Sequence, residues 1–146
     1  MVRFKNRYLL CELKWEDGKY DPRIKNKDIY DALREAVATN FGDLGSAEIV
    51  SSLGVRYWNP VTSLVVIRVA RDHHRKLWAA LSLTSHIKAR RVRPKVLHSA
   101  GTIRTVERKA AFMIRDWLGK AQSVIERKRR ELQASDMILE LQQLTN

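Results

Sequence analysis

The sequence predicts an α+β fold, in which a four-stranded antiparallel sheet follows the order β-α-β-β-α-β and extra helices stand at the C-terminus. Three observations support it. Four segments are rich in apolar residues with the alternation or short continuous runs of strands, and two segments between them repeat apolar residues at helical spacing. The chain has 146 residues, of which 45% are hydrophobic. This is enough for one compact domain with a core of its own.

The first strand is predicted over residues 3–14, where apolar side chains point to both faces. Tyr8 and Leu10 point to one face, whereas Leu9 and Cys11 point to the other. A strand of this kind lies inside a sheet that is covered on both sides. We therefore expect a C-terminal helix to cover the face that the two central helices leave open.

The other elements follow from spacing and turn residues. After a loop at 15–27, we expect a helix at 28–40, which Asp28 caps and Gly42 and Gly45 end. Two strands follow at 47–58 and 61–70, joined by Asn59-Pro60, and then a helix that Asp72 caps, with Leu77, Trp78 and Leu81 inward. The rest is a basic stretch at 88–95, a short strand at 96–98, a long helix that Thr102 caps, and a last short helix from Ser135. This order is ferredoxin-like. We expect one domain at 1–134, including the long helix, and a short helix or tail at 135–146.

The charge is strongly positive and unevenly distributed. The net charge is +12 and the pI is about 10.3. Residues 51–109 carry thirteen basic and two acidic residues, whereas residues 1–50 carry nine of each and residues 110–146 carry six and five. A block at net +11 indicates a polyanionic partner: a nucleic acid, an anionic membrane face or an acidic protein.

Several kinds of chemistry have no support in the sequence. No apolar run is long enough to span a bilayer, and the N-terminal residues lack the apolar core of a signal peptide. Cys11 is the only cysteine and reads as a small buried hydrophobe, so we expect no disulfide and a reducing compartment. The pair His73-His74 diverges on a helix, and we expect no metal site and no catalytic residue. The chain contains neither a phosphate-binding loop motif nor a G-x-S-x-G motif.

Three segments combine basic, aromatic and polar groups: residues 3–8, 56–60 and 101–104. Arg forks suit phosphate oxygens, and Tyr can stack on an unpaired base. Tyr8 and Tyr57 can equally be core aromatics, and Thr102 a simple helix cap. With part of the basic stretch, the candidate RNA-binding residues are Arg3, Lys5, Asn6, Arg7, Tyr8, Arg56, Tyr57, Asn59, Arg91, Arg93, Lys95, Thr102 and Arg104.

The same segments resemble a known family, the small Pop-family (Pop5/Rpp14-type) protein subunits of ribonuclease P and ribonuclease MRP. The opening MVRFKNRYLLCEL (residues 1–13), RYWNPVT (56–62) and SAGTIR (99–104) are similar to three signatures of that family, in the same order. Residues 71–78 are similar to its second helix. The similarity covers roughly residues 1–110.

The resemblance implies an RNA-recognition-like fold and a non-catalytic role. The expected partners are the ribonuclease P/MRP RNA, a barrel-shaped subunit of about 30 kDa and the other proteins of the complex, with precursor tRNA nearby and no membrane. This chain would bind no cofactor, and Mg²⁺ would act in the RNA active site. The implied work is 5′ maturation of precursor tRNA and processing of precursor rRNA, in the nucleus and nucleolus, for either complex or both.

Two alternatives stay open at the level of sequence. The chain can be a protein-interaction module, including one of another ribonucleoprotein, that docks a partner through a sheet edge or through the acidic region at 15–50. Tight binding to the barrel-shaped subunit without RNA would indicate such a module. It can also be a small enzyme, because the split βαβ order hosts enzymes, metal carriers and RNA binders alike.

Overall fold

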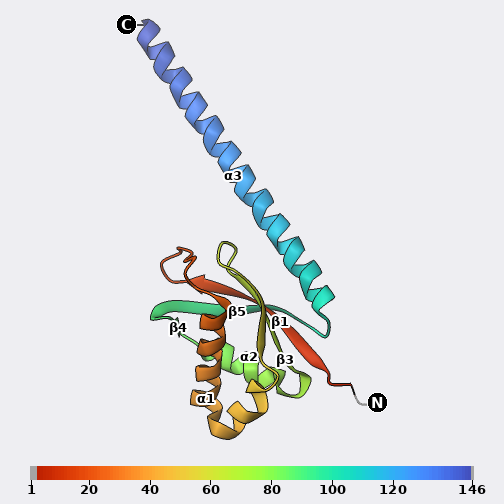
Figure 1. Ribbon diagram of the computed structural model, residues 1–146. Helices are drawn as coiled ribbons and strands as arrows, with labels where there is room; N and C mark the ends of the chain where they lie inside the picture. The colour runs from red at the N-terminus through yellow and green to blue at the C-terminus, as the bar shows by residue number, and fades with distance from the viewer. Residues whose placement is uncertain (1–2, 146) are drawn as a thin grey trace. The chain divides into compact units, whose positions relative to one another are not determined.

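The computed structural model describes residues 3–145 (Figure 1). Met1 and Val2, with which the family resemblance begins, and Asn146 lie outside the described residues. The chain forms two compact units, divided between Ala110 and Ala111. The elements, in order, are β1 (Asn6–Trp15), α1 (Asn26–Val50), β2 (Gly54–Asn59), β3 (Leu64–Ala70), a 3₁₀ turn (Arg71–His73), α2 (His74–Leu83), β4 (His86–Ile87), β5 (Arg90–Ala100) and α3 (Ile103–Thr145).

The α+β class is confirmed, but residues 3–145 form five strands and not four. The sheet has the order β2-β3-β1-β5-β4, and every pair in it is antiparallel. The additional strand arises because a two-residue turn, Lys88-Ala89, folds β4 back onto β5. Both turn residues have positive φ, at 49° and 62°, as the tightest hairpins require. The basic stretch predicted at 88–95 is therefore mostly strand, and the strand predicted at 96–98 is the middle of a longer one.

The helical segment predicted at 28–40 ends at Gly42 as expected, because the φ of 69° and ψ of −165° at Gly42 are not helical. The sequence did not predict the second helical segment of α1, which follows Gly42 and runs to Val50. Ile29, Leu33 and Val37 are the buried residues of the first segment, and Gly45 and Ile49 are those of the second. Consequently β2 begins at Gly54 and not at residue 47. Asp28 stands inside the first turn, where its carboxylate accepts a 2.8 Å hydrogen bond from the Lys25 amide.

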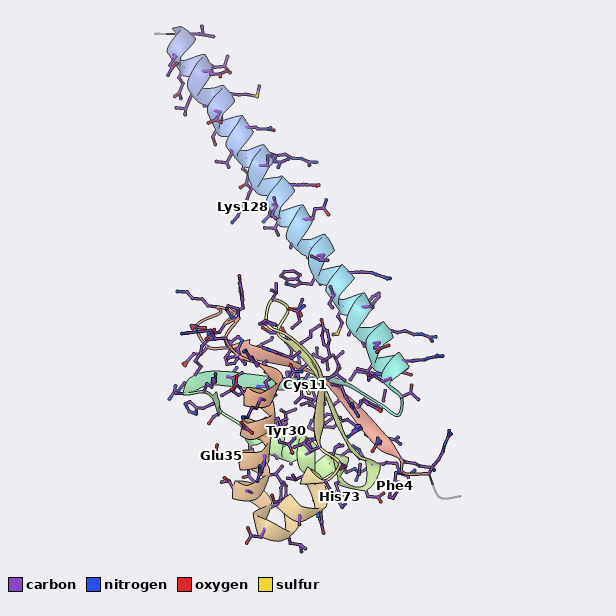
Figure 2. All side chains as sticks on the ribbon, viewed as in Figure 1. Phe4, Cys11, Tyr30, Glu35, His73 and Lys128 are labelled. Atoms are coloured by element: carbon purple, nitrogen blue, oxygen red, sulfur yellow. The ribbon has the colours of Figure 1, made fainter. Side chains whose placement is uncertain are left out.

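The main core lies between the sheet and the helices α1 and α2, which cover one of its faces (Figure 1). Leu9, Cys11 and Leu13 of β1 contribute to it, together with Val65 and Ile67 of β3. Figure 2 shows Cys11 in the middle of the sheet, and its thiol is fully buried. Burial raises the pKa of Cys11 well above its ordinary value, so the thiol stays protonated and unreactive. The reading of Cys11 as a buried hydrophobe is confirmed.

The opposite face of the sheet, which we call the open face because α1 and α2 leave it uncovered, also has an apolar centre. Leu10 of β1, Leu64 and Val66 of β3 and Ala100 of β5 are buried but lie outside the main core. The two-sided burial predicted for the first strand is confirmed. Val106 and Ala110 from the first two turns of α3 are buried as well and belong to the same compact unit.

The remaining helices differ from expectation in detail. Trp78 was predicted to point inward, but its side chain is 40% exposed. A 3₁₀ turn precedes α2, and no side-chain cap from Asp72 is present. Thr102 caps α3 as predicted, since its Oγ1 accepts a 3.4 Å hydrogen bond from the Thr105 amide. The short helix predicted from Ser135 does not exist separately, because α3 passes through this position without a break.

The second compact unit, from Ala111 onward, consists of the rest of α3. Several of its apolar side chains, among them Leu118, Ile125 and Leu132, are more than half exposed. None of the helices within residues 3–145 is long and apolar enough to cross a membrane.

Candidate nucleic-acid interface

Ion pairs divide the basic residues into compensated and uncompensated groups. Acidic residues from the first half of the chain neutralise cations that follow β3. The pairs are Lys76–Glu48 at 2.8 Å, Lys88–Asp28 at 3.3 Å, Arg90–Asp17 at 2.8 Å and Arg91–Glu16 at 3.5 Å. Carboxylates of the first fifty residues therefore compensate four of the cations in residues 51–109. The positive excess lies on the other cations of that block.

Four carboxylates, those of Asp17, Asp21, Asp28 and Glu48, have pKa values below their ordinary values. Hydrogen bonds from the Lys19 and Lys25 backbones lower the pKa values of Asp17 and Asp28, with help from Arg90 and Lys88. The Arg23 side chain lowers the pKa of Asp21, and Lys76 lowers that of Glu48.

A depressed carboxylate pKa stabilises the fold above the unfolded-state value, and this contribution disappears as pH falls through the folded-state value. The ordinary values are 3.8 for Asp and 4.5 for Glu. We therefore expect the melting temperature to fall below about pH 4, measured by circular dichroism. The Asp28→Asn/Glu48→Gln variant should lose less stability than wild type over this range. An identical acid profile in both proteins would contradict this assignment.

Arg90 stabilises the fold through the contacts of its guanidinium. Its guanidinium stacks over the ring of Trp15, 4.4 Å from the centroid. It donates hydrogen bonds to both carboxylate oxygens of Asp17 and to the Lys19 carbonyl, at 2.8–2.9 Å. The loop after β1 is thereby fixed to the start of β5.

The strand register places many of the remaining polar and basic side chains on the open face. Directly opposed residues of antiparallel strands point to the same face, and alternate residues of one strand share it. Tyr8, Arg68 and Ala100 form one cross-strand row, and Tyr57, Val66, Leu10 and His98 form the next. From the same registers, the predicted binding residues on this face are Tyr8, Tyr57, Asn59, Arg91, Arg93 and Lys95.

The side chains of Tyr8, Tyr57 and Asn59 are partly accessible on the open face, and Asn59 also contributes to the fold. Tyr8 is partly buried and Tyr57 is 39% exposed, so neither is an enclosed core aromatic. The Asn59 carboxamide oxygen accepts a 2.9 Å hydrogen bond from the Val61 amide. Asn59 therefore also has a structural task in the turn between β2 and β3.

A second group of predicted residues meets at one end of the sheet. The pairing of Tyr8 with Ala100 places Asn6 and Arg7 beside the Gly101–Arg104 segment. The Arg7 guanidinium lies against Gly101: a Cβ built there would be 3.0 Å from Nη1. Arg7 makes one long hydrogen bond, 3.4 Å, to the neighbouring Asn6 carbonyl. Its guanidinium therefore keeps donors available at this end.

The other members of this end are exposed and basic or polar. Arg3, Lys5 and Arg104 are exposed, and the Arg71 amide donates a 2.9 Å hydrogen bond to the Lys5 carbonyl, which fixes the backbone there. Thr102 is occupied as a helix cap. Arg56 stands apart, since it lies at a β-bulge in the edge strand β2.

Sequence reasoning missed four open-face residues: Lys14, Arg68, His86 and His98. The register shows them on this face. The alternation of β1 could have revealed Lys14, whereas the other three depend on pairings that only the fold defines. Among residues 3–145, no cluster of three His, Cys, Asp or Glu side chains has the geometry to hold a metal ion.

Fold and surface together define a small basic α+β protein with cations and aromatic rings on an open sheet face. Residues 7–111 match the model of the Rpp14/Pop5 family, and the chain belongs to this family. The family resemblance of the three sequence segments is thereby confirmed.

Curated relatives agree with this assignment. The chain is 39% identical over 116 residues to the ribonuclease P/MRP protein subunit POP5 of Schizosaccharomyces pombe. This match covers 73% of this chain and 84% of that protein. It is 38% identical over 114 residues to the Danio rerio protein of the same name, with 74% and 68% covered. The Homo sapiens protein of that name is 32% identical over 112 residues, with 74% and 69% covered.

A solved structure shows a similar fold. A chain in the cryo-EM structure of yeast ribonuclease MRP superimposes with a TM-score of 0.50 at 12% identity, over 83% of this chain and 98% of that chain.

Proposed function

We propose that this chain is a non-catalytic, RNA-binding protein subunit of ribonuclease P and ribonuclease MRP. The observation that carries the proposal is the match of residues 7–111 to the Rpp14/Pop5 family. The matched segment contains the open face and most of the Arg7–Arg104 end of the sheet. A surface with cations in excess of carboxylates fits the phosphate backbone of a folded RNA.

In this proposal the RNA performs phosphodiester hydrolysis with Mg²⁺ in its own active site. The protein supplies guanidinium and ammonium groups that hold the catalytic core of the RNA in its folded shape. The complex would release the 5′ leader of precursor tRNA and process precursor rRNA, in the nucleus and nucleolus. The ferredoxin-like, RNA-recognition-type arrangement of the strands is part of the same proposal, with the order β2-β3-β1-β5 as its support.

The helical side of the domain supports a protein partner as well. Leu44 of α1 and Trp78 and Leu83 of α2 are exposed large apolar side chains. Such residues commonly mark protein contacts when they lie on one surface. We propose that another protein of the complex, the barrel-shaped subunit of about 30 kDa, binds this side while the open face and the Arg7–Arg104 end take the RNA.

The salt dependence of RNA binding tests the proposal. Each neutralised phosphate should lower the logarithm of the affinity by about 0.7–0.9 for each tenfold rise in salt. We expect a steep decline for the cognate RNA in a filter-binding or fluorescence assay with the full chain. Binding that does not change with salt would count against a phosphate-contacting surface.

A further inference from the structure

A groove opens at the end of the sheet farthest from Gly101. It has a volume of about 650 Å³ and is lined by side chains from the ends of β1 and β5 and from β4, among them Lys14, Trp15, Glu16, His86, Arg91 and Arg93. Trp15 lies seven residues along β1 from Tyr8, which corresponds to about 23 Å of strand. The groove is thus separate from the Arg7–Arg104 end.

The groove contains an unfavourable arrangement of like charges. Lys14 and Arg93 are directly opposed on β1 and β5, and like charges in this position destabilise a sheet. Arg91, two residues from Arg93 on the same face, is opposed to His86. Within residues 3–145, Lys14 and Arg93 form no ion pair, and Glu16 approaches only Arg91, at 3.5 Å. Three permanent cations and one carboxylate therefore leave a local excess of two positive charges.

The walls of the groove are fixed by the fold. Trp15 is only 8% exposed and is clamped by Arg90, whose carboxylate and carbonyl partners were described above. The Val92 amide donates a 2.9 Å hydrogen bond to the Ser85 carbonyl, and the Glu16 amide donates one of 3.2 Å to the Arg91 carbonyl. The backbone that carries Lys14 and Arg93 is therefore fixed, so the conformational freedom lost on binding is mainly that of their two exposed side chains.

We infer that this groove binds a phosphate group, with Lys14 and Arg93 as its main ligands. A phosphate placed between the two opposed cations removes their repulsion, and the guanidinium of Arg93 matches two phosphate oxygens at once. In the neighbouring cross-strand row, Arg91 adds positive charge and His86 adds a ring N–H. The assignment of this phosphate to an RNA strand rests on the proposed function, whereas the phosphate site itself does not.

Inorganic phosphate tests the site without RNA. The full chain is titrated at constant ionic strength and followed by ¹⁵N-resolved NMR. The indole N–H of Trp15 is a suitable reporter because it is buried without a hydrogen-bond partner, whereas the indole N–H of Trp58, bonded to the Ile24 carbonyl at 2.9 Å, is an internal reference. We expect a saturable shift at Trp15, little change at Trp58, and no saturable shift at Trp15 in the Lys14→Gln/Arg93→Gln variant.

The matched control replaces cations on the helical side, in the Arg34→Gln/Arg75→Gln variant. It should respond to phosphate as wild type does. An unsaturable response at Trp15, or an equal loss of response in both variants, would overturn the phosphate site. Circular dichroism of each variant establishes that it is folded before the comparison is made.

A second measurement places the phosphate on RNA. The Lys14→Gln/Arg93→Gln variant should bind the cognate RNA with a salt slope smaller by about 1 than wild type, whereas the Arg34/Arg75 control keeps its slope. Short RNAs with a 5′-phosphate or a 5′-hydroxyl then separate a terminal phosphate from a backbone phosphodiester. If the wild-type chain binds the cognate RNA but shows no saturable phosphate shift at Trp15, the groove alone is refuted. If it shows the phosphate shift but binds no RNA, the proposed function alone is refuted.

Discussion

We expect the Arg7→Gln/Arg104→Gln variant to bind the cognate ribonuclease P or MRP RNA about 100-fold more weakly than wild type, because a hydrogen bond to a charged group contributes about 1.5–3 kcal/mol and each 1.4 kcal/mol is tenfold in affinity. Both side chains lie at the Gly101 end of the sheet. Arg7 makes only one long internal hydrogen bond, and Arg104 is exposed on the first turn of α3. The melting temperature should therefore change little.

The comparison requires affinities and melting temperatures for both proteins, with Arg34→Gln/Arg75→Gln as the control of equal charge change. The control should keep most of its affinity, since its arginines lie on α1 and α2. If the Arg7/Arg104 variant loses stability in proportion to affinity, these residues are structural. If its affinity equals that of the control, the RNA does not contact this end of the sheet.

The largest loss of stability is expected for Leu9→Ala. Leu9 is fully buried in the main core, on a strand that is paired on both sides with β3 and β5. Truncation removes apolar contacts and leaves a cavity that rigid neighbours cannot fill, so the free energy of unfolding should fall by about 2–5 kcal/mol. Urea denaturation followed by circular dichroism measures this.

Phe4→Ala is the matched control on the same segment. Phe4, labelled in Figure 2, is 96% exposed, so its truncation should change the free energy of unfolding by less than about 0.5 kcal/mol. A loss below about 1 kcal/mol for Leu9→Ala would show that β1 is not the centre of the core.

Features that depend on local periodicity were predictable from the sequence. The two-sided burial of β1, the succession of strands and helices and the Thr102 cap were of this kind. The misses have a common cause, which is that tertiary packing overrode a local signal. Gly42 interrupts α1 as its sequence signal indicates, but a second helical segment follows where a strand was predicted from residue 47, and its Ile49 is buried in the main core. Lys88-Ala89 formed a tight turn without glycine or asparagine, which no turn rule would have selected.

The candidate site was predictable in position but not in detail. Counting charges located the basic region, but it could not show that Arg90 is bound by Asp17 and Trp15. Nor could it show that Arg91 approaches Glu16. Arg68 and His98 belong to the open face only because the register pairs them with Tyr8 and Leu10. The pairing of distant residues is a property of the sheet, and a linear charge count does not contain it.

The most direct test of the central claim is to purify the tagged full-length protein from its own cells and to sequence the RNA that accompanies it. We expect strong enrichment of ribonuclease P RNA, ribonuclease MRP RNA or both. We also expect a marked decrease in that enrichment for the Arg7→Gln/Arg104→Gln variant. Purification without either RNA above the level of an untagged control, from a protein shown to be folded, would contradict the account.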